Sequence, residues 1–390
     1  MPAHILLINH EFPPVGGGAA TAAAQIAREM ARLGVRVTVL TSAHAGLPRR
    51  EERDGYVVER LAARRRRRDS SNILEMLSFL FSSLVWVLRR GRARRPEVCL
   101  AFFGLPGGPA AWLLRKTAGV PYIISLRGGD VPGFLPESLG RWHLLSGPVI
   151  RFLWRRAEFV VANSRGLARL ALRSAPWQAI EIISNGVDVP PAAAPDGRGR
   201  AFAAEGARLI SVGRLNAQKN YPALLEALAG LSQAGWRLEI IGDGPEGERL
   251  RALAGRLGLS ARISFSGWLD RAELRRRLAA ADIFVFPSIQ EGMPNAVLEA
   301  MAAALPVVAC AVEGCEELVA DGETGLLTPP ADVEALRLAL ARLLADPALC
   351  RRLGLAGRAR AEERYAWRTT AEAYLRLCAA ANRPAARAGH

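Results

Sequence analysis

The chain of 390 residues is half apolar, with 37 Gly and 24 Pro spread along it, and this composition excludes a disordered or low-complexity chain. Its length exceeds that of a domain with one hydrophobic core of ordinary size. Its formal net charge of +15 favours an anionic partner, and nucleic acid, a membrane surface and a phosphorylated small molecule all remain open. The cysteines form no C-x-x-C pair and the histidines have no metal-ligand spacing, so the common zinc motifs are excluded and a reduced, cytoplasmic setting is favoured.

Short apolar runs alternate with longer helical patterns through the first half of the chain. Each run has the length of a strand, is rich in β-branched residues and is followed by enough chain for a crossover helix. The runs are ILLI (5–8), VRVTVL (35–40), VCLAFF (98–103), YIIS (122–125) and FVVA (159–162). This alternation predicts a parallel sheet that is covered by helices on both faces.

The alternation pauses at residues 189–200, VPPAAAPDGRGR, and then starts again. Pro, Ala and Gly replace the apolar pattern there, as in an interdomain linker. The second series of runs is RLISV (208–212), RLEII (237–241), RISF (262–265), IFVF (283–286) and PVVA (306–309). We therefore expect two doubly wound α/β domains, with ligands at the carboxyl ends of their strands. From about residue 331 the pattern is helical, with a break at Pro347.

Three consecutive glycines, Gly16, Gly17 and Gly18, follow the first strand and open a helix. Their backbone N–H groups can approach an anionic ligand closely, and a helix N-terminus favours negative charge. Thr21 stands where a G-x-G-x-x-G motif needs its third glycine, so a dinucleotide site is disfavoured. The loop is predicted to contact a ligand, with a plain connector as the alternative.

The segment VGRLNAQKN, residues 212–220, lies between a strand and a helix. Gly213 ends the strand, Arg214 offers a planar fork of donors and Lys219 offers a point charge, which together suit a diphosphate. The alternative is that the two cations are ordinary exposed surface residues that bind no ligand. The similar turn in IIGDGPEGERL, residues 240–250, is interpreted as scaffolding that brings backbone near a ligand.

The stretch EGMPNAVLEAM, residues 291–301, sets two acids eight positions apart after a strand. Pro294 predicts the first helical position, so Glu291 precedes the helix and Glu299 lies more than one turn inside it. The N–H groups of residues 292–296 are donors and the two carboxylates are acceptors. This combination suits a nucleotide sugar, whereas a capping Glu291 and a surface Glu299 are the alternative.

Taken in order, these segments resemble the retaining GT-B glycosyltransferases of glycosyltransferase family 4. The resemblance covers nearly the whole chain and includes the glycine loop, SNGVD (184–188), VGRLNAQKN, IGDGPE, FPSIQEGMPNAVLEAM, PVVA and DGETGLL. It implies an α/β fold of two doubly wound Rossmann-like domains that face each other across a cleft. The implied parts are an acceptor domain (1–190), a linker (191–205), a nucleotide-sugar donor domain (206–366), a helix that packs back on the first domain (367–382) and a tail (383–390).

The resemblance implies transfer of a sugar from a UDP- or GDP-sugar to a glycan or lipid-linked acceptor, with the anomeric configuration retained, in cell-surface polysaccharide or glycolipid synthesis. Catalytic roles are implied for Arg214 and Lys219 at the diphosphate leaving group and for Glu291 at the transferred sugar. Glu299 would bind the ribose. The other implied donor-binding residues are Gly17, Gly18, Gly213, Trp268, Leu269, Asn295 and Ala296. The lack of a D-x-D motif fits transfer without a metal or other cofactor.

Two positions depart from the family pattern. SLRGGD has Arg127 where a histidine is common in H-G-x-D, with Asp130 three residues later. An arginine stays charged and cannot act as a base, so we expect Arg127 and Asp130 on the acceptor side, with an anion-binding role for Arg127. Ala304 replaces the glycine of A-x-G-x-P, which we interpret as tolerated packing.

An apolar segment, residues 73–88, lies between the basic runs RRRRR (64–68) and RRGRARR (89–95). It is shorter than the about 20 residues that span a bilayer. Its narrow polar stripe at helical spacing consists of Glu75, Ser78 and Ser82. An ordinary crossover helix and an interfacial contact with anionic lipid both remain open, so peripheral membrane binding is one expectation.

Two other classes of function are weighed against the glycosyltransferase. A GT-B-like nucleotide-sugar epimerase needs acid and base groups around the sugar, and the chain has five histidines, few of them in the loop segments described above. A module that binds nucleic acid would explain the positive charge but leaves Glu291 and Glu299 without a role. We therefore expect a nucleotide sugar and not a nucleic acid as the ligand.

Overall fold

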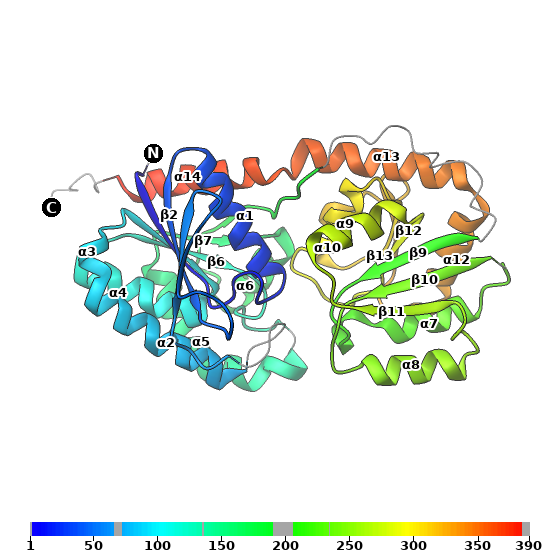
Figure 1. Cartoon of the computed structure of the whole chain (residues 1–390), viewed down its shortest axis with the longest axis horizontal. Helices are drawn as coiled ribbons and strands as arrows, with labels where there is room; N and C mark the ends of the chain where they lie inside the picture. Colours follow the sequence, from blue (N-terminus) through cyan, green and yellow to red (C-terminus); the bar gives the residue numbers. More distant parts are fainter. Residues whose placement is uncertain (1, 66–71, 135, 190–205, 234, 384–390) are drawn as a thin grey trace. The chain divides into compact units, whose positions relative to one another are not determined.

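The structure is a computed structural model of the chain, and it describes residues 2–65, 72–134, 136–189, 206–233 and 235–383. The chain divides into two compact units (Figure 1). Unit 1 contains Met1–Gly186 and Trp367–His390, and unit 2 contains Val187–Ala366. The linker expected over 191–205 and nearly all of the tail expected over 383–390 lie outside the described residues.

Unit 1 is built on a sheet in which eight strands are described, in the order β3-β4-β2-β1-β5-β6-β7-β8. The neighbouring strands are parallel, except that β3 is antiparallel to β4. The strands are β1 (His4–Ile8), β2 (Arg36–Ser42), β3 (Arg50–Arg53), β4 (Tyr56–Leu61), β5 (Val98–Phe102), β6 (Tyr122–Leu126), β7 (Phe159–Ala162) and β8 (Ile180–Ile182).

The predicted strands of unit 1 are confirmed, because each apolar run forms a strand of the sheet. Every residue of β1, β5 and β6 is buried, as expected for central parallel strands with helices on both faces. The hairpin of β3 and β4 and the short edge strand β8 were not predicted. β3 reads REER and is mostly exposed, so it has no apolar run to reveal it.

Helices cover both faces of this sheet, and each face has its own core. Phe79, Trp86, Leu114 and Trp154 are among the residues of the core under α2, α4 and α5. The core on the other face lies under α1 and α14. The helices of unit 1 are α1 (Gly18–Arg32), α2 (Ile73–Trp86), α3 (Arg92–Arg94), α4 (Gly108–Ala118), α5 (Pro136–Arg156), α6 (Arg165–Ser174) and α14 (Trp367–Ala381).

The C-terminal helix α14 belongs to unit 1 although it follows the whole of unit 2 in the sequence. Trp367, Ala371 and Tyr374 are buried in the same core as Ala23 and Ile26 of α1 (Figure 1). The Tyr374 hydroxyl is 2.7 Å from Ser125 Oγ on β6. The last helix is therefore part of the first unit's core.

Unit 2 contains a second parallel sheet, whose six described strands have the order β11-β10-β9-β12-β13-β14. β9 is the first strand of this unit along the chain, yet it lies between β10 and β12. The strands are β9 (Ala207–Val212), β10 (Trp236–Ile241), β11 (Ile263–Gly267), β12 (Ile283–Phe286), β13 (Val307–Cys310) and β14 (Gly325–Thr328). The junction of β9 and β12 is a topological switch point, where doubly wound sheets bind ligands.

The helices of unit 2 also form two layers, with one core on each face of the sheet. The helices are α7 (Tyr221–Ala229), α8 (Gly247–Arg256), α9 (Arg271–Ala280), α10 (Asn295–Ala302), α11 (Glu313–Leu318), α12 (Val333–Ala345) and α13 (Pro347–Arg364). The break predicted at Pro347 is present, because α12 ends at Ala345 and Asp346 caps α13 by accepting a hydrogen bond from the Leu349 N–H at 2.9 Å.

Candidate functional site

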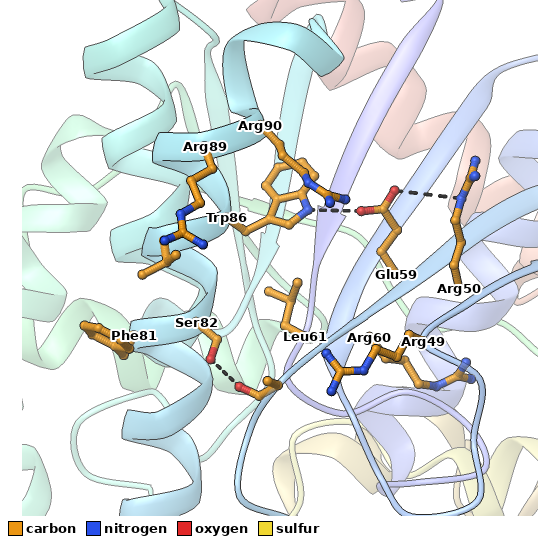
Figure 2. Close-up of a pocket in the computed structure, with 12 residues that line it drawn as sticks. Arg49, Arg50, Glu59, Arg60, Leu61, Phe81, Ser82, Trp86, Arg89 and Arg90 are labelled. Carbon is orange, nitrogen blue, oxygen red and sulfur yellow. Dashed lines mark hydrogen bonds and ion pairs between the residues drawn. The ribbon is translucent and has the colours of Figure 1, made fainter.

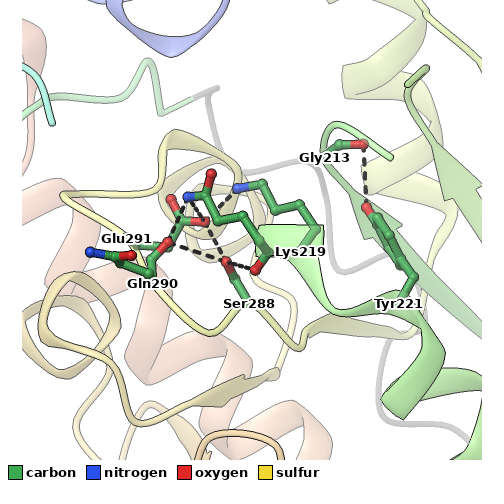
Figure 3. Close-up of polar contacts among 7 residues, drawn as sticks. Gly213, Lys219, Tyr221, Ser288, Gln290 and Glu291 are labelled. Atoms are coloured by element: carbon green, nitrogen blue, oxygen red, sulfur yellow. Dashed lines mark hydrogen bonds and ion pairs between the residues drawn. The ribbon is translucent and has the colours of Figure 1, made fainter. Parts of the chain in front are cut away.

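The loops that follow β9 and β12 meet at the switch point of unit 2. Lys219, at the end of the first loop, places its Nζ 2.5 Å from Oε1 of Glu291 in the second (Figure 3). The same carboxylate oxygen accepts a hydrogen bond from Ser288 Oγ at 2.6 Å and one from Gln218 Nε2 at 3.3 Å. Glu291 is thus held by a cation and two neutral donors before any ligand is considered.

Neither Ser288 nor Gln218 was among the predicted site residues. Ser288 Oγ also lies 2.9 Å from the backbone oxygen of Gln218, and Gln218 Nε2 donates to the backbone oxygen of Gln290 at 2.6 Å. These bonds tie the two loops together. The sequence signal that points to them is their position, since each lies in the loop directly after a buried strand and next to a predicted residue.

Glycines let the backbones of the neighbouring loops approach one another. A Cβ atom on Gly242, whose φ is +136°, would lie 2.1 Å from the backbone oxygen of Gly213. One on Gly244 would lie 2.3 Å from the oxygen of Leu215. The interpretation of residues 240–250 as scaffolding agrees with this packing, because these glycines fix the loop that carries Arg214. Arg214 itself is half-buried.

Helix α10 begins at Asn295, so Pro294 is the residue before the helix and not its first residue. The prediction for Pro294 was wrong by one position, because its ψ of 111° is extended, and a helix boundary depends on backbone geometry that the sequence does not show. Asn295 and Ala296 form the first turn, as predicted, and both are half-buried.

The loop before α10 rests on the start of α11. A Cβ atom on Gly314 would lie 2.4 Å from the backbone oxygen of Gly292 and 3.1 Å from that of Glu291. Only a residue without a side chain permits this approach. The position of Glu291 therefore depends on a glycine that the sequence motifs did not single out.

Glu299 lies on α10 away from the Lys219 pair and has different charged neighbours. One of its carboxylate oxygens is 3.9 Å from Arg271 NH2, at the start of α9. Burial raises the pKa of Glu299, Arg271 and Arg275 oppose the rise, and Asp188 adds to it. Arg275 is itself 2.8 Å from Asp188. Glu291 and Glu299 therefore sit in separate electrostatic surroundings.

Trp268 and Leu269 follow β11, on the other side of β10 from the switch point. The Trp268 N–H donates to Asp243 Oδ2 at 3.0 Å, and the Gly242 N–H donates to the Gly267 oxygen at 2.8 Å. The Trp268 side chain is 60% exposed, so its ring is accessible for stacking. Asp243 was not predicted to position this loop.

Arg127 and Asp130 are brought together in unit 1. Asp130 Oδ1 accepts the N–H groups of Arg127 and Gly128 at 2.9 and 3.2 Å, and its Oδ2 accepts that of Gly104 at 2.8 Å. Burial raises the pKa of Asp130, and these N–H donors oppose the rise. Asp130 thus fixes the turn that follows β6.

The guanidinium of Arg127 is engaged within unit 1. Its NH1 donates to Asn185 Oδ1 at 2.7 Å, its NH2 donates to the Tyr374 hydroxyl at 3.3 Å, and Cζ lies 4.0 Å from the centre of the Phe102 ring. Arg127 therefore links β6 to α14 and to the SNGVD segment. Each of these two hydrogen bonds uses one of the two hydrogens on a terminal nitrogen, and the anion-binding role expected for Arg127 stays a prediction.

A pocket of about 540 Å³ opens in unit 1 beside Asp130. Its lining is mainly apolar and includes His10, Glu11 and Phe103 from the loops after β1 and β5, together with Trp142 of α5. Burial lowers the pKa of His10 to about 4. Gly17 is the residue before α1 and donates its N–H to Glu11 Oε2 at 2.9 Å, while Gly18 starts the helix.

The polar stripe of α2 faces the protein's own chain. Ser78 Oγ accepts the Arg64 N–H at 2.9 Å, Ser82 donates to the backbone of Ala62, and Glu75 and Asn72 form a capping box. The opposite side of the segment is exposed and apolar, with Leu74 73%, Phe81 70% and Leu88 67% accessible. Within the described part of the chain, no helix combines the length and apolarity needed to cross a bilayer.

Acidic, cysteine and histidine side chains do not gather in the described ranges: no three of them lie where they could hold one metal ion. The five cysteines are all buried and unpaired by disulfides.

The fold and this site define the class of the protein. Sucrose-phosphate synthase from Thermosynechococcus elongatus has a solved structure that matches with a TM-score of 0.81 and 26% identity, over 97% of this chain and 99% of that one. With its two parallel-sheet α/β units and the paired polar loops at the switch point of unit 2, the protein has the fold of a GT-B glycosyltransferase.

Sequence comparison gives the family. Residues 198–360 match the model described as glycosyl transferases group 1, and residues 17–186 match the glycosyl transferase 4-like domain. The 2-deoxystreptamine glucosyltransferase of Streptomyces kanamyceticus is 30% identical over 83% of this chain and 89% of its own length. The lipopolysaccharide core biosynthesis glycosyltransferase LpsE of Rhizobium meliloti is 33% identical over 58% of this chain, and the match spans 65% of that relative. The chain belongs to the glycosyl transferases group 1 family.

Proposed function

We propose that the chain transfers a sugar from a UDP- or GDP-sugar to a glycan or lipid-linked acceptor with retention of the anomeric configuration. The observation that carries this proposal is the meeting of Lys219 and Glu291 at the switch point of unit 2. A cation and an acid in contact there provide one group for phosphate and one for sugar hydroxyls.

Lys219 and Arg214 are proposed to stabilise the diphosphate as the glycosidic bond breaks. Negative charge grows on the leaving phosphate during that step, so fixed cations bind the transition state more tightly than the ground state. Lys219 has little freedom to move, because it is 84% buried as a side chain and its Nζ lies 4.5 Å from the centre of the Phe286 ring. The N–H groups at the start of α10, at Asn295 and Ala296, add a favourable field for phosphate.

The two acids have separate roles in this proposal. Glu291 accepts hydrogen bonds from the transferred sugar's hydroxyls, and Glu299 accepts them from the ribose. Gly213 permits close approach of backbone, while Trp268 and Leu269 lie at the nucleotide base. The donor-phosphate role expected for Gly17 and Gly18 in unit 1 stays a prediction.

The retaining step is proposed to follow the front-face course that the family resemblance implies. The bond from the anomeric carbon to the phosphate oxygen breaks, the acceptor oxygen bonds to the same face of that carbon, and the acceptor proton passes to the departing diphosphate. Glu291 positions the sugar and does not become bonded to it, in contrast to double displacement by a carboxylate nucleophile. The cations Lys219 and Arg214 take the place that a metal ion would have.

The apolar pocket of unit 1 is proposed to bind the acceptor. Its lining of aromatic and aliphatic side chains beside Asp130 suits a molecule with an apolar part and a few hydroxyl groups. LpsE acts in lipopolysaccharide core biosynthesis by its name, and a lipid-linked or polysaccharide acceptor at the cell surface is proposed here too.

The proposed function includes peripheral binding of the chain to a membrane through α2. The helix presents apolar side chains outward and its polar stripe inward, as an interfacial helix does. Of the arginines at 64–68, residues 66–68 lie outside the described residues. Cosedimentation with anionic vesicles tests the idea: binding that is lost when the arginines at 64–68 are neutralised supports it, and binding that persists contradicts it.

Thermal unfolding with a panel of nucleotide sugars tests the donor, because a ligand that binds the folded state alone raises its stability. The best donor is then incubated with the protein, and the product is followed by NMR with and without a metal chelator. We expect slow hydrolysis that first releases the sugar in the configuration of the donor and that the chelator leaves unchanged. The opposite configuration would refute retention, and an epimerised donor would favour the epimerase.

A further inference from the structure

A second pocket of unit 1, of about 460 Å³, has no role in the proposed sugar transfer. It lies between the hairpin of β3 and β4 on one side and the end of α2 with the following turn on the other (Figure 2). Five arginines line it in the described part of the chain, and Glu59 is the single acid among its lining residues. The arginines are Arg49, Arg50 and Arg60 from the hairpin side and Arg89 and Arg90 from the helix side.

The acid in this pocket is already neutralised. Glu59 is buried, its Oε2 accepts the Trp86 indole N–H at 3.0 Å, and its Oε1 accepts a hydrogen bond from Arg94 at 2.7 Å. Arg50 stands farther away, with Nε 4.0 Å from the same oxygen. Glu59 therefore orders one wall of the pocket and leaves it electropositive.

The five arginines differ in how many bonds their side chains make to the rest of the protein. Arg60 is 1% exposed and bonded to Glu51 and to the Pro48 oxygen, so it is a structural residue. Arg49, Arg89 and Arg90 are exposed, and none of their side chains makes an ion pair or hydrogen bond within the described residues. All three line the pocket, Arg49 from the hairpin side and Arg89 and Arg90 from the helix side (Figure 2). Like charges that line one pocket repel one another, and an anion bound between them relieves the repulsion.

The floor and rim of the pocket are apolar. Leu61, Val85 and Trp86 contribute aliphatic and aromatic surface, and Phe81 stands at the edge with 70% of its surface exposed. Phe81 continues the exposed apolar side of α2 that includes Leu74 and Leu77. The pocket therefore joins a cluster of guanidinium groups to an apolar helix face.

We propose that this pocket binds the phosphate group of a phosphorylated molecule that also carries an apolar part. Guanidinium groups match phosphate oxygens in charge and in planar, two-pronged geometry, and a phosphate offers enough oxygens for more than one of them. The apolar rim favours a phospholipid headgroup as the source, while a soluble phosphate ester is the other source of the same chemistry. The pocket belongs to unit 1 and the switch point belongs to unit 2, so the proposal does not rest on the donor assignment.

The test compares the full chain with Arg89→Gln/Arg90→Gln and, separately, Arg49→Gln. The matched control is Arg36→Gln/Arg173→Gln, which removes two exposed charges of unit 1 outside the pocket. One arm measures binding of glycerol 3-phosphate by NMR. The other measures binding to phosphatidylcholine vesicles that contain phosphatidic acid, or oleate at equal surface charge. Far-UV circular dichroism and the thermal response to the donor sugar are recorded for every variant.

We expect the double pocket variant to lose about 30-fold in affinity for phosphatidic acid vesicles or for glycerol 3-phosphate, since each basic side chain near an anionic group contributes about fivefold. The control should change by less than about threefold, because charges outside the pocket act through screened, distant interactions. Loss in the vesicle arm identifies a lipid source, and loss in the soluble arm alone identifies a soluble ester.

Three results would overturn the phosphate site: equal loss in the control, no loss in either arm, or a loss confined to the vesicle arm together with equal binding to oleate vesicles. The thermal response to the donor sugar distinguishes a failure of the phosphate site from a failure of the proposed function. The pocket variants should keep it, because Arg49, Arg89 and Arg90 are absent from unit 2. A wild-type chain without any donor response would refute the sugar-transfer proposal and leave the phosphate measurement intact.

Discussion

Lys219 Nζ lies 2.5 Å from Glu291 Oε1, although 72 residues separate them along the chain. The residue expected to bind diphosphate and the residue expected to bind the transferred sugar are thus each other's partners. Because Ser288 and Gln218 also donate to Glu291, the carboxylate keeps two further hydrogen bonds when the Lys219 ammonium also binds a phosphate oxygen. The pair therefore aligns both groups in advance, which limits the reorganisation that donor binding requires.

Replacing Lys219 by Met should lower kcat by about 10² to 10³, the usual effect of removing one group that stabilises charge in a transition state. Steady-state kinetics with the best donor measures it. Lys116→Met is a fitting control, since Lys116 is the other lysine of the chain and lies exposed on α4. If the two variants have equal kcat, Lys219 does not act on the leaving group.

Glu299→Gln should weaken nucleotide binding, and it should also flatten the dependence of binding on pH. The raised pKa of Glu299 means that the carboxylate takes up a proton above its ordinary pKa of 4.5 as the pH falls. The wild type should therefore lose affinity for UDP or GDP on acidification from above pH 4.5, because a protonated carboxyl is a weaker acceptor.

Isothermal titration of the nucleotide across pH compares this variant with the wild type and with Glu248→Gln, an exposed acid of α8. Glu248→Gln should follow the wild-type curve. An unchanged affinity in Glu299→Gln at neutral pH would show that the ribose does not bind there.

Gly314→Ala should destabilise the chain by about 1 to 3 kcal/mol, the usual cost of an added carbon in a packed site. Its new Cβ would lie 2.4 Å from the Gly292 oxygen, so the loop that carries Glu291 must move. The control Gly255→Ala also lies in a helix, but its nearest neighbour is 3.7 Å away, and it should stabilise the chain by about 0.5 to 1 kcal/mol. Urea unfolding and kcat check both; a Gly314→Ala variant with wild-type stability and kcat contradicts the contact.

Tyr374→Phe should cost about 1 to 3 kcal/mol in the free energy of unfolding. The change removes the hydroxyl that joins Ser125 Oγ at 2.7 Å and Arg127 NH2 at 3.3 Å, and it leaves the buried Ser125 and the half-buried Arg127 with one bond fewer each. Urea unfolding measures the loss. If stability is unchanged while acceptor turnover falls, Arg127 serves the acceptor and its link to α14 is secondary.

His10 should make the chain less stable as the pH falls. The unfolded chain binds the proton near pH 6.5, whereas burial keeps the folded imidazole neutral until the pH reaches about 4. Between these values the free energy of unfolding should decrease by about 1.4 kcal/mol per pH unit from this group. Urea unfolding at pH 7 and pH 5 should show a smaller decrease for His10→Gln than for the wild type; equal decreases would mean that His10 is not buried as a neutral group.

The regular parts of the fold follow from local sequence patterns. IFVF and PVVA form β12 and β13 within one residue of the predicted bounds, because a strand buried on both faces needs a continuous apolar run. The hairpin of β3 and β4 could not be predicted in this way. Its edge strand β3, REER, is exposed and pairs through its backbone, so it needs no apolar side chains. The hairpin forms one wall of the arginine pocket, so that site could not be predicted either.

The candidate site was predictable in part. Lys219, Gly213 and Glu291 were singled out because each follows a strand, and the sheet then brings their loops to one edge. Ser288 and Gln218 were missed because a serine or glutamine in a loop has no distinctive pattern. Arg127 differs from these residues: its sequence position predicts a ligand contact, whereas the structure gives it Asn185, 58 residues later, and Tyr374 of α14, 247 residues later, as partners.

Local patterns in the sequence establish the class of fold, the strands that have a continuous apolar run of the kind singled out above, and the family. These depend on periodicity and on short motifs, which are properties of neighbouring residues. Which residues come together is visible in the three-dimensional structure alone: Lys219 with Glu291, Gly314 with the loop before α10, and the arginines of the hairpin with those that follow α2. Such pairings depend on strand order and on close approach of backbones, and many strand orders are compatible with the same local pattern.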